Sequence, residues 1–116
     1  MIPSGVQIFL ALGRVDMRLG YERLGGLVRE QIGYEPRSGA LFIFVGRRRE
    51  TIKVLFFDGS GMCVFQKKLD RGRFALPEVA EGVTHVEIDD AALDVLLDGV
   101  EIVKPPRPRT PPRRVH

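Results

Sequence analysis

The side chains that could act as nucleophiles or general bases are few and scattered along the chain. There is one cysteine, Cys63, and there are two histidines, His85 and His116. The serines stand in glycine-containing loops, but none has the Gly-x-Ser-x-Gly frame of a hydrolase nucleophile. Cys63 lies in an apolar stretch typical of a small core residue, and His85 has no obvious nucleophile as its partner. The sequence therefore predicts a protein that is not an enzyme.

Metal chemistry is also poorly supported by the residue types. One cysteine excludes an intramolecular disulfide and a multi-cysteine zinc site. Asp58 and Asp70 flank an expected strand and are hard-cation ligands by type, but aspartate is ordinary in turns and at strand ends. We therefore expect neither a metal nor another cofactor. A nuclease that uses these two aspartates is the hypothesis that we rank last, below the two binding functions described below.

Basic residues give the stronger signal. Three arginines follow Gly46 at an expected hairpin tip, and a second basic cluster follows the third strand of the same expected sheet. In an antiparallel meander, these two places lie at the same edge of the sheet, where they would attract phosphates. A charged tip that only blocks aggregation is the alternative. The candidate nucleic-acid-binding residues are Arg47, Arg48, Arg49, Lys53, Lys67, Lys68, Arg71 and Arg73.

The net charge of +3 conceals three blocks of different sign. Residues 1–77 carry a net +6, residues 78–103 hold eight acids and no base, and residues 104–116 hold five bases and no acid. Fourteen of the 18 basic residues are arginine, whose planar fork suits bidentate phosphate contacts. The acidic block offers a different use, as a surface for a basic protein partner.

The expected elements indicate an α+β fold. Residues 6–11 predict a strand, and apolar residues at Met17, Tyr21, Leu24, Val28 and Ile32 predict a helix over about 20–32, closed by a glycine. Residues 40–45, 51–57 and 62–69 predict an antiparallel meander over about 40–69. A short strand over 84–88 and a helix capped by an aspartate and running through residue 98 complete the pattern.

We therefore predict a small, mainly antiparallel sheet with the first helix packed on one face. The domain is expected over residues 1–103, followed by a disordered Pro/Arg-rich tail over 104–116, which contains five prolines. No apolar stretch approaches the ~20 residues that span a bilayer, and we expect a cytoplasmic protein without membrane contact. Much of the core is expected from Ile8, Leu10, Leu24, Val28, Phe42, Phe44, Val54, Phe56 and Phe65.

The order and spacing of several short motifs resemble the accessory protein (TnpB, or Orf2-like) of insertion sequence 66 family transposable elements. The resemblance covers about residues 2–77 and extends more loosely to about 103. It rests on Ile2-Pro3-Ser4-Gly5, Gly13, Asp16-Met17-Arg18, Gly20, Leu24, Leu27-Val28, Ser38-Gly39, Leu41-Phe42, Phe44, Gly46-Arg47-Arg48, Ile52-Lys53-Val54-Leu55, Asp58-Gly59, Gly61, Lys68-Leu69, Arg71-Gly72-Arg73-Phe74 and Pro77.

This resemblance implies a non-catalytic helper of transposition whose partner is a larger, element-encoded transposase. Two hypotheses follow. The protein binds element-end DNA, or helps the transposase to hold it, through the basic edge. Alternatively, it is a protein-interaction module that binds the transposase through the acidic segment 78–103 without contacting DNA.

Overall fold

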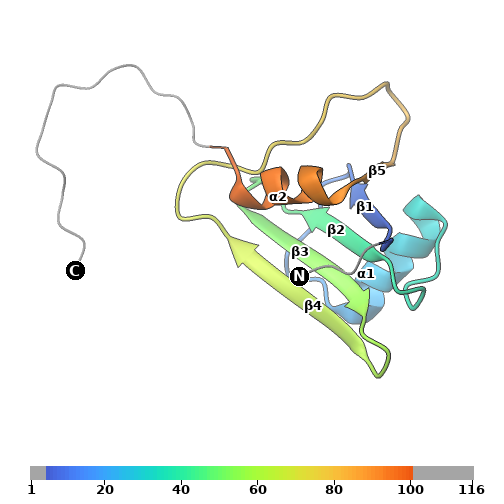
Figure 1. The fold of residues 1–116 in the computed structure, drawn as a ribbon. Helices are drawn as coiled ribbons and strands as arrows, with labels where there is room; N and C mark the ends of the chain where they lie inside the picture. The colour runs from blue at the N-terminus through green and yellow to red at the C-terminus, as the bar shows by residue number, and fades with distance from the viewer. Residues whose placement is uncertain (1–4, 101–116) are drawn as a thin grey trace, which may run out of the picture.

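The computed structural model describes residues 5–100 of the 116-residue chain. Within them, strands and helices alternate as Figure 1 shows. The elements are β1 (Ile8–Ala11), α1 (Tyr21–Leu27), a π-helical continuation (Val28–Ile32), β2 (Leu41–Val45), β3 (Thr51–Phe57), β4 (Met62–Lys68), β5 (His85–Ile88) and α2 (Asp90–Asp98). The predicted α+β fold is confirmed, and each expected strand and helix is found within about two residues of its predicted bounds.

The strands of this part of the chain form one sheet in the order β4-β3-β2-β1-β5. The meander is confirmed, because β2, β3 and β4 pair antiparallel in sequence order. β1 pairs antiparallel with β5 but parallel with β2, so α1 is the crossover between two parallel strands. As a result, the loop after β1 leaves the sheet at the same end as the tip between β2 and β3.

The first helix ends where a glycine permits a left-handed backbone. Gly33 has φ 79°, and its N–H donates to the Val28 carbonyl over 2.8 Å. Leu24, Val28 and Ile32 are buried as predicted, whereas Tyr21 is 54% exposed. The predicted stripe was wrong at Tyr21, because the helix begins there and the step from Met17 lies in a loop.

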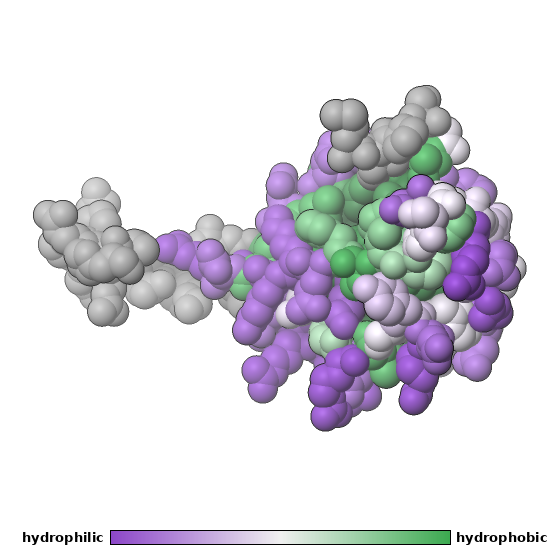
Figure 2. Space-filling model, turned by 90° about the horizontal axis from the view of Figure 1, so that it is seen from below, coloured by the Kyte–Doolittle hydropathy of each residue, from purple (hydrophilic) through white to green (hydrophobic). Residues whose placement is uncertain are grey.

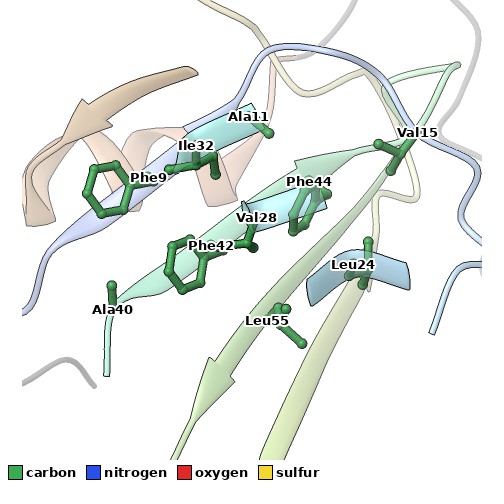
Figure 3. Packing of buried hydrophobic residues seen from close by; sticks show 10 residues of the cluster. All are labelled: Phe9, Ala11, Val15, Leu24, Val28, Ile32, Ala40, Phe42, Phe44 and Leu55. Carbon is green, nitrogen blue, oxygen red and sulfur yellow. The ribbon is translucent and has the colours of Figure 1, made fainter. Parts of the chain in front are cut away.

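One apolar cluster fills the space between α1 and the sheet. Figure 3 shows Val28 from the helical segment lying between the rings of Phe42 and Phe44 on β2. The Phe9 and Phe42 rings stack with their centroids 5.8 Å apart. This is the helix-covered face that the sequence predicted.

The opposite face of the sheet is covered as well. Leu93 and Leu96 of α2 and the wholly buried Phe74 pack there against alternate residues of the strands, Ile8, Leu10, Ile43, Val45, Ile52 and Val54. The expectation of a buried Phe65 was wrong: this side chain is 49% exposed, because β4 is an edge strand and has a sheet neighbour on one side only. Phe56 is half-buried.

Two of the predictions from sequence concern residues beyond the described range of 5–100. The tail over 104–116 lies outside the described residues, and so does the predicted domain limit at 103. None of the helices within residues 5–100 is long and apolar enough to cross a membrane.

Candidate nucleic-acid interface

The arginine-rich turn between β2 and β3 is a tightly bonded structure. The Gly46 N–H donates to the Thr51 carbonyl over 2.9 Å, and the Arg49 N–H donates back to the Gly46 carbonyl over 2.8 Å. Arg49 has φ 61°, a left-handed conformation that non-glycine residues adopt mainly in turns. The turn thereby leaves Arg47 and Arg48 exposed and Arg49 half-buried.

The segment that follows β4 wraps onto this turn. The Leu69 N–H donates to the Glu50 carbonyl over 2.8 Å, and the Phe74 N–H donates to the Arg49 carbonyl over 2.6 Å. Phe74 is wholly buried on the α2 face and anchors the segment. Arg71 and Arg73 lie on the loop between these two bonds, both exposed. The two basic clusters therefore share one end of the sheet, which is the juxtaposition that the meander predicted.

Backbone pairing also ties this loop to the end of α2. Arg73 and Val100 exchange two hydrogen bonds of 2.8 and 2.7 Å. Between Arg71 and Arg73, Gly72 has φ 73° and turns the chain. In Figure 1, the arrowheads of β2 and β4 point to this end of the sheet, and hydrophilic side chains line the same left-hand end in Figure 2.

A third basic segment lies against the turn and was missed from the sequence. The Val15 N–H donates to the Val45 carbonyl over 3.0 Å, and the Arg14 guanidinium donates to the Arg47 carbonyl over 3.3 Å. Arg14 and Arg18 are both exposed. The strand-helix-strand pattern of residues 6–45 was the signal that could have found them, because it is typical of a parallel crossover.

A hollow of about 350 Å³ opens between these segments, with Asp16, Arg47, Arg48, Glu50 and Lys68 on its walls. Over residues 14–18, 47–50 and 68–73, eight basic side chains stand against three carboxylates. Positive charge therefore dominates this surface, which we call the basic end.

One of those carboxylates forms an ion pair with a neighbouring arginine. Asp16 accepts three hydrogen bonds from the Arg18 guanidinium at 2.7, 3.0 and 3.2 Å, and one from the Arg18 backbone N–H at 2.9 Å. These bonds, with a smaller contribution from the charge of Arg47, hold the pKa of Asp16 far below its usual range. Asp16 therefore stays ionised and orients Arg18.

Two of the predicted binding lysines have other contacts. Lys53 is only 9% exposed, and its ammonium donates to the Leu19 carbonyl over 2.9 Å. Lys67 points to the α2 face and donates to the Leu97 carbonyl over 2.6 Å, which satisfies an open carbonyl in the last turn of the helix. Neither belongs to the basic end, whereas Lys68 is exposed on it.

The residues considered for catalysis are spread apart. Asp58 and Asp70 lie at opposite ends of β4, a strand of seven residues and about 20 Å, so they cannot share a metal ion. Across residues 5–100, no group of three or more His, Cys, Asp or Glu side chains is placed to hold a metal. His85 sits beside the Thr84 hydroxyl and packs edge-on against Phe9.

Asp58 and Cys63 have local roles. Asp58 accepts hydrogen bonds from the N–H groups of Ser60 and Gly61 over 2.8 and 2.9 Å, which lowers its pKa. Cys63 is half-buried, and that burial, reinforced by the Asp58 charge, raises the pKa of its thiol. A raised pKa disfavours the thiolate, the nucleophilic form of cysteine.

The acidic segment forms a separate surface. Asp89 caps α2 by accepting from the Ala92 N–H over 2.8 Å, while Asp90, Asp94 and Asp98 are exposed along the helix. Glu78 and Glu81 are exposed on the loop that precedes β5. These exposed carboxylates lie in the segment for which the charge blocks predicted an alternative interface.

The sequence was compared with protein families, with curated proteins and with solved structures. The model of the IS66 Orf2 like protein family matches residues 6–107. A protein of Sinorhizobium fredii, uncharacterized protein y4hO, is 42% identical over 103 residues, which are 87% of this chain and 88% of the relative. Uncharacterized protein y4jC of the same organism is 33% identical over 106 residues, 90% and 91% of the two chains. No solved structure shows a significant match.

Proposed function

Because the chain belongs to the IS66 Orf2-like family, which implies an accessory role in transposition, we propose that it contacts element DNA through its basic end. The contacts are made to phosphates, and the residues that make them are the exposed basic residues of the three segments, together with the half-buried Arg49: Arg14, Arg18, Arg47, Arg48, Lys68, Arg71 and Arg73.

One observation carries this proposal. Backbone hydrogen bonds from Leu69 and Phe74 to the 49–50 turn fix two arginine clusters, more than twenty residues apart in sequence, against each other. Holding like charges close together costs electrostatic free energy. A bound polyanion offsets this repulsion, and the release of its counterions favours binding further. Surface charge that serves solubility alone needs no such fixed juxtaposition.

The chemistry of the surface fits phosphate positioning rather than cleavage. Arginine donates to phosphate oxygens in a bidentate manner, and these contacts fix register without reading sequence. No candidate nucleophile or metal group lies among the described residues of the basic end. We therefore propose a non-catalytic helper that holds element ends for the transposase.

The test is salt-dependent binding to a labelled duplex that carries an element end, measured by fluorescence anisotropy. The variant Arg47→Ala/Arg48→Ala/Arg71→Ala/Arg73→Ala should bind more weakly than wild type, and its salt slope should fall by about one unit for each lost phosphate contact. An unrelated duplex of equal length separates sequence-independent from specific binding.

A matched control removes the same kind of charge elsewhere. Arg23 and Arg37 are exposed on α1 and on the loop before β2, outside the segments that form the basic end. Arg23→Ala/Arg37→Ala should leave the salt slope nearly unchanged. Equal losses in both variants would show a response to net charge alone and would overturn the proposal.

The second candidate function is transposase binding through the acidic segment, and the exposed carboxylates along α2 favour it. Co-purification with the transposase, with and without terminal DNA, separates the two candidates. Retention without DNA that is lost in Asp90→Asn/Asp94→Asn/Asp98→Asn would support a protein-docking role. Retention that requires DNA would support the basic end.

A further inference from the structure

β4 forms one of the two edges of the sheet and is long and apolar for an edge strand. It runs over seven residues without proline, and within residues 5–100 no strand pairs with its outer side. Soluble proteins usually protect such edges with charges, prolines or bulges, because an open edge can pair with another chain. Here the lysines stand at one end of β4, and Lys67 is turned toward α2.

The hydrogen bonds at both ends of β4 reveal which backbone groups face outward. Asp58 bonds to Gly61 at the turn, and Leu69 bonds to Glu50 at the other end. Hydrogen-bonded pairs alternate along an antiparallel ladder, so Cys63, Phe65 and Lys67 bond inward to β3. The outward-facing N–H and C=O groups therefore belong to Met62, Val64, Gln66 and Lys68.

We propose that a second copy of this chain pairs with this edge, β4 antiparallel to β4, about a two-fold axis at Phe65. That register pairs Met62 with Lys68 of the second copy and Val64 with Gln66 of the second copy. Every outward-facing group then meets an outward-facing group of the other strand. All seven residues of β4 take part, and the two sheets become one.

The side chains favour the same register. The two Phe65 residues, each 49% exposed, would face each other in the non-hydrogen-bonded pair at the axis, where Cα atoms lie only ~4.5 Å apart. Phe65 also lines an apolar hollow of about 720 Å³ between α2 and the strands, so the pair would extend an existing apolar surface. Figure 2 shows hydrophobic residues exposed on the side of the molecule seen from below, where β4 runs in Figure 1.

Charge complements this pairing. The Asp58 turn is at one end of β4, and Lys68 with Arg71 is at the other. An antiparallel arrangement brings the acidic turn of each copy toward the basic residues of the other, whereas a parallel arrangement would place like charges together. The occupant that these features fit is therefore the chain itself in antiparallel orientation.

Light scattering after size-exclusion chromatography, without DNA, tests the pairing. The wild type should show twice the chain mass of 13.0 kDa. Gln66→Pro removes an outward N–H and leaves the β3 ladder intact, so the folded variant should be monomeric. Gln66→Ala keeps the N–H and should remain dimeric. A monomeric wild type at hundreds of micromolar, or a folded Gln66→Pro dimer, would overturn the proposal.

Cysteine cross-linking tests the register, in a Cys63→Ser background. A cysteine introduced by Phe65→Cys faces its own copy across the axis within disulfide reach and should form a covalent dimer under mild oxidation. The matched control, Gln66→Cys, is displaced by two residues along the strands and should stay uncross-linked. Cross-linking of the control alone, or of neither variant, would refute this register, and neither result bears on DNA binding.

Discussion

The two faces of the sheet carry similar apolar cores but are assembled from different stretches of chain. The buried residues of the α1 face all lie within residues 9–55, which include the helix and the strands on either side of it, while Met62 and Val64 of β4 pack against their margin. The α2 face needs Phe74 and α2, which lie after the meander. The loop of the basic end that carries Arg71 and Arg73 is attached to the second face, through Phe74 and through the pairing of Arg73 with Val100.

This difference indicates that folding stability and the position of the basic loop are coupled on the α2 face and not on the α1 face. Damage to the α1 face should lower stability without rearranging the loop that carries Arg71 and Arg73. Damage to the α2 face should do both, because the same residues close that core and position the loop. The predictions below separate the two faces.

Phe74→Ala should have the largest effect. Removing a wholly buried phenylalanine costs about 3–5 kcal/mol of unfolding free energy, measured by urea denaturation. Phe42→Ala, on the α1 face, is the matched control with a similar cost. Hydrogen exchange should show lost protection at Arg73 and Val100 in the first variant only. Equal loss of protection in both would show that the faces are not separable.

Lys53→Met should destabilise the α1 face by about 1–3 kcal/mol, because the Leu19 carbonyl loses its donor in a buried setting. Lys67→Met removes the corresponding bond on the α2 face, at the half-buried end of α2, and should cost less. Thermal unfolding of both variants measures the difference. A larger loss in Lys67→Met would reverse the assignment of Lys53 as the more deeply structural lysine.

Asp89→Ala should cost about 1 kcal/mol, since it removes the side-chain cap on the Ala92 N–H. Asp90→Ala is the control, because Asp90 lies in the first turn and is not the cap. Faster amide exchange is expected at the start of α2 in the cap variant, with α1 unaffected. Faster exchange in α1 would contradict the separation of the faces.

Local sequence patterns predicted most of the helices and strands. Which strands lie side by side, and which of them is at an edge, depends on the arrangement of the whole sheet. Runs of β-branched and aromatic residues separated by glycine turns were enough to identify the meander, and apolar residues at helical spacing identified the stripe at Leu24, Val28 and Ile32. Phe65 alternates like a core residue, and only its edge position leaves it exposed. Nothing in the local pattern of β4 distinguishes an edge strand from a central one.

The features of the candidate site likewise fall into those that local sequence predicted and those that depend on the whole fold. The meander predicted that the two arginine clusters lie at the same end of the sheet, and the structure shows them there. The burial of Lys53 did not follow, because a lysine in a strand looks exposed until α1 and the preceding loop cover it. Arg14 and Arg18 required the parallel pairing of β1 with β2, which depends on a contact between residues more than thirty apart.

The smallest expected effect belongs to the Asp58 turn between β3 and β4, which lies outside both cores. Hydrogen bonds from Ser60 and Gly61 lower the pKa of Asp58 from its usual 3.8, so its contribution to stability is present above that pH and is lost as pH falls through the lower, folded-state pKa. Asp58→Asn keeps an acceptor oxygen but cannot titrate there. Melting temperatures measured from pH 7 to pH 2 should therefore fall further for wild type than for the variant, with wild type slightly higher at neutral pH. Because the turn belongs to neither core, hydrogen exchange in α1 and α2 should be alike in the two proteins at pH 7. Parallel pH curves would show that the charge of Asp58 does not stabilise the turn.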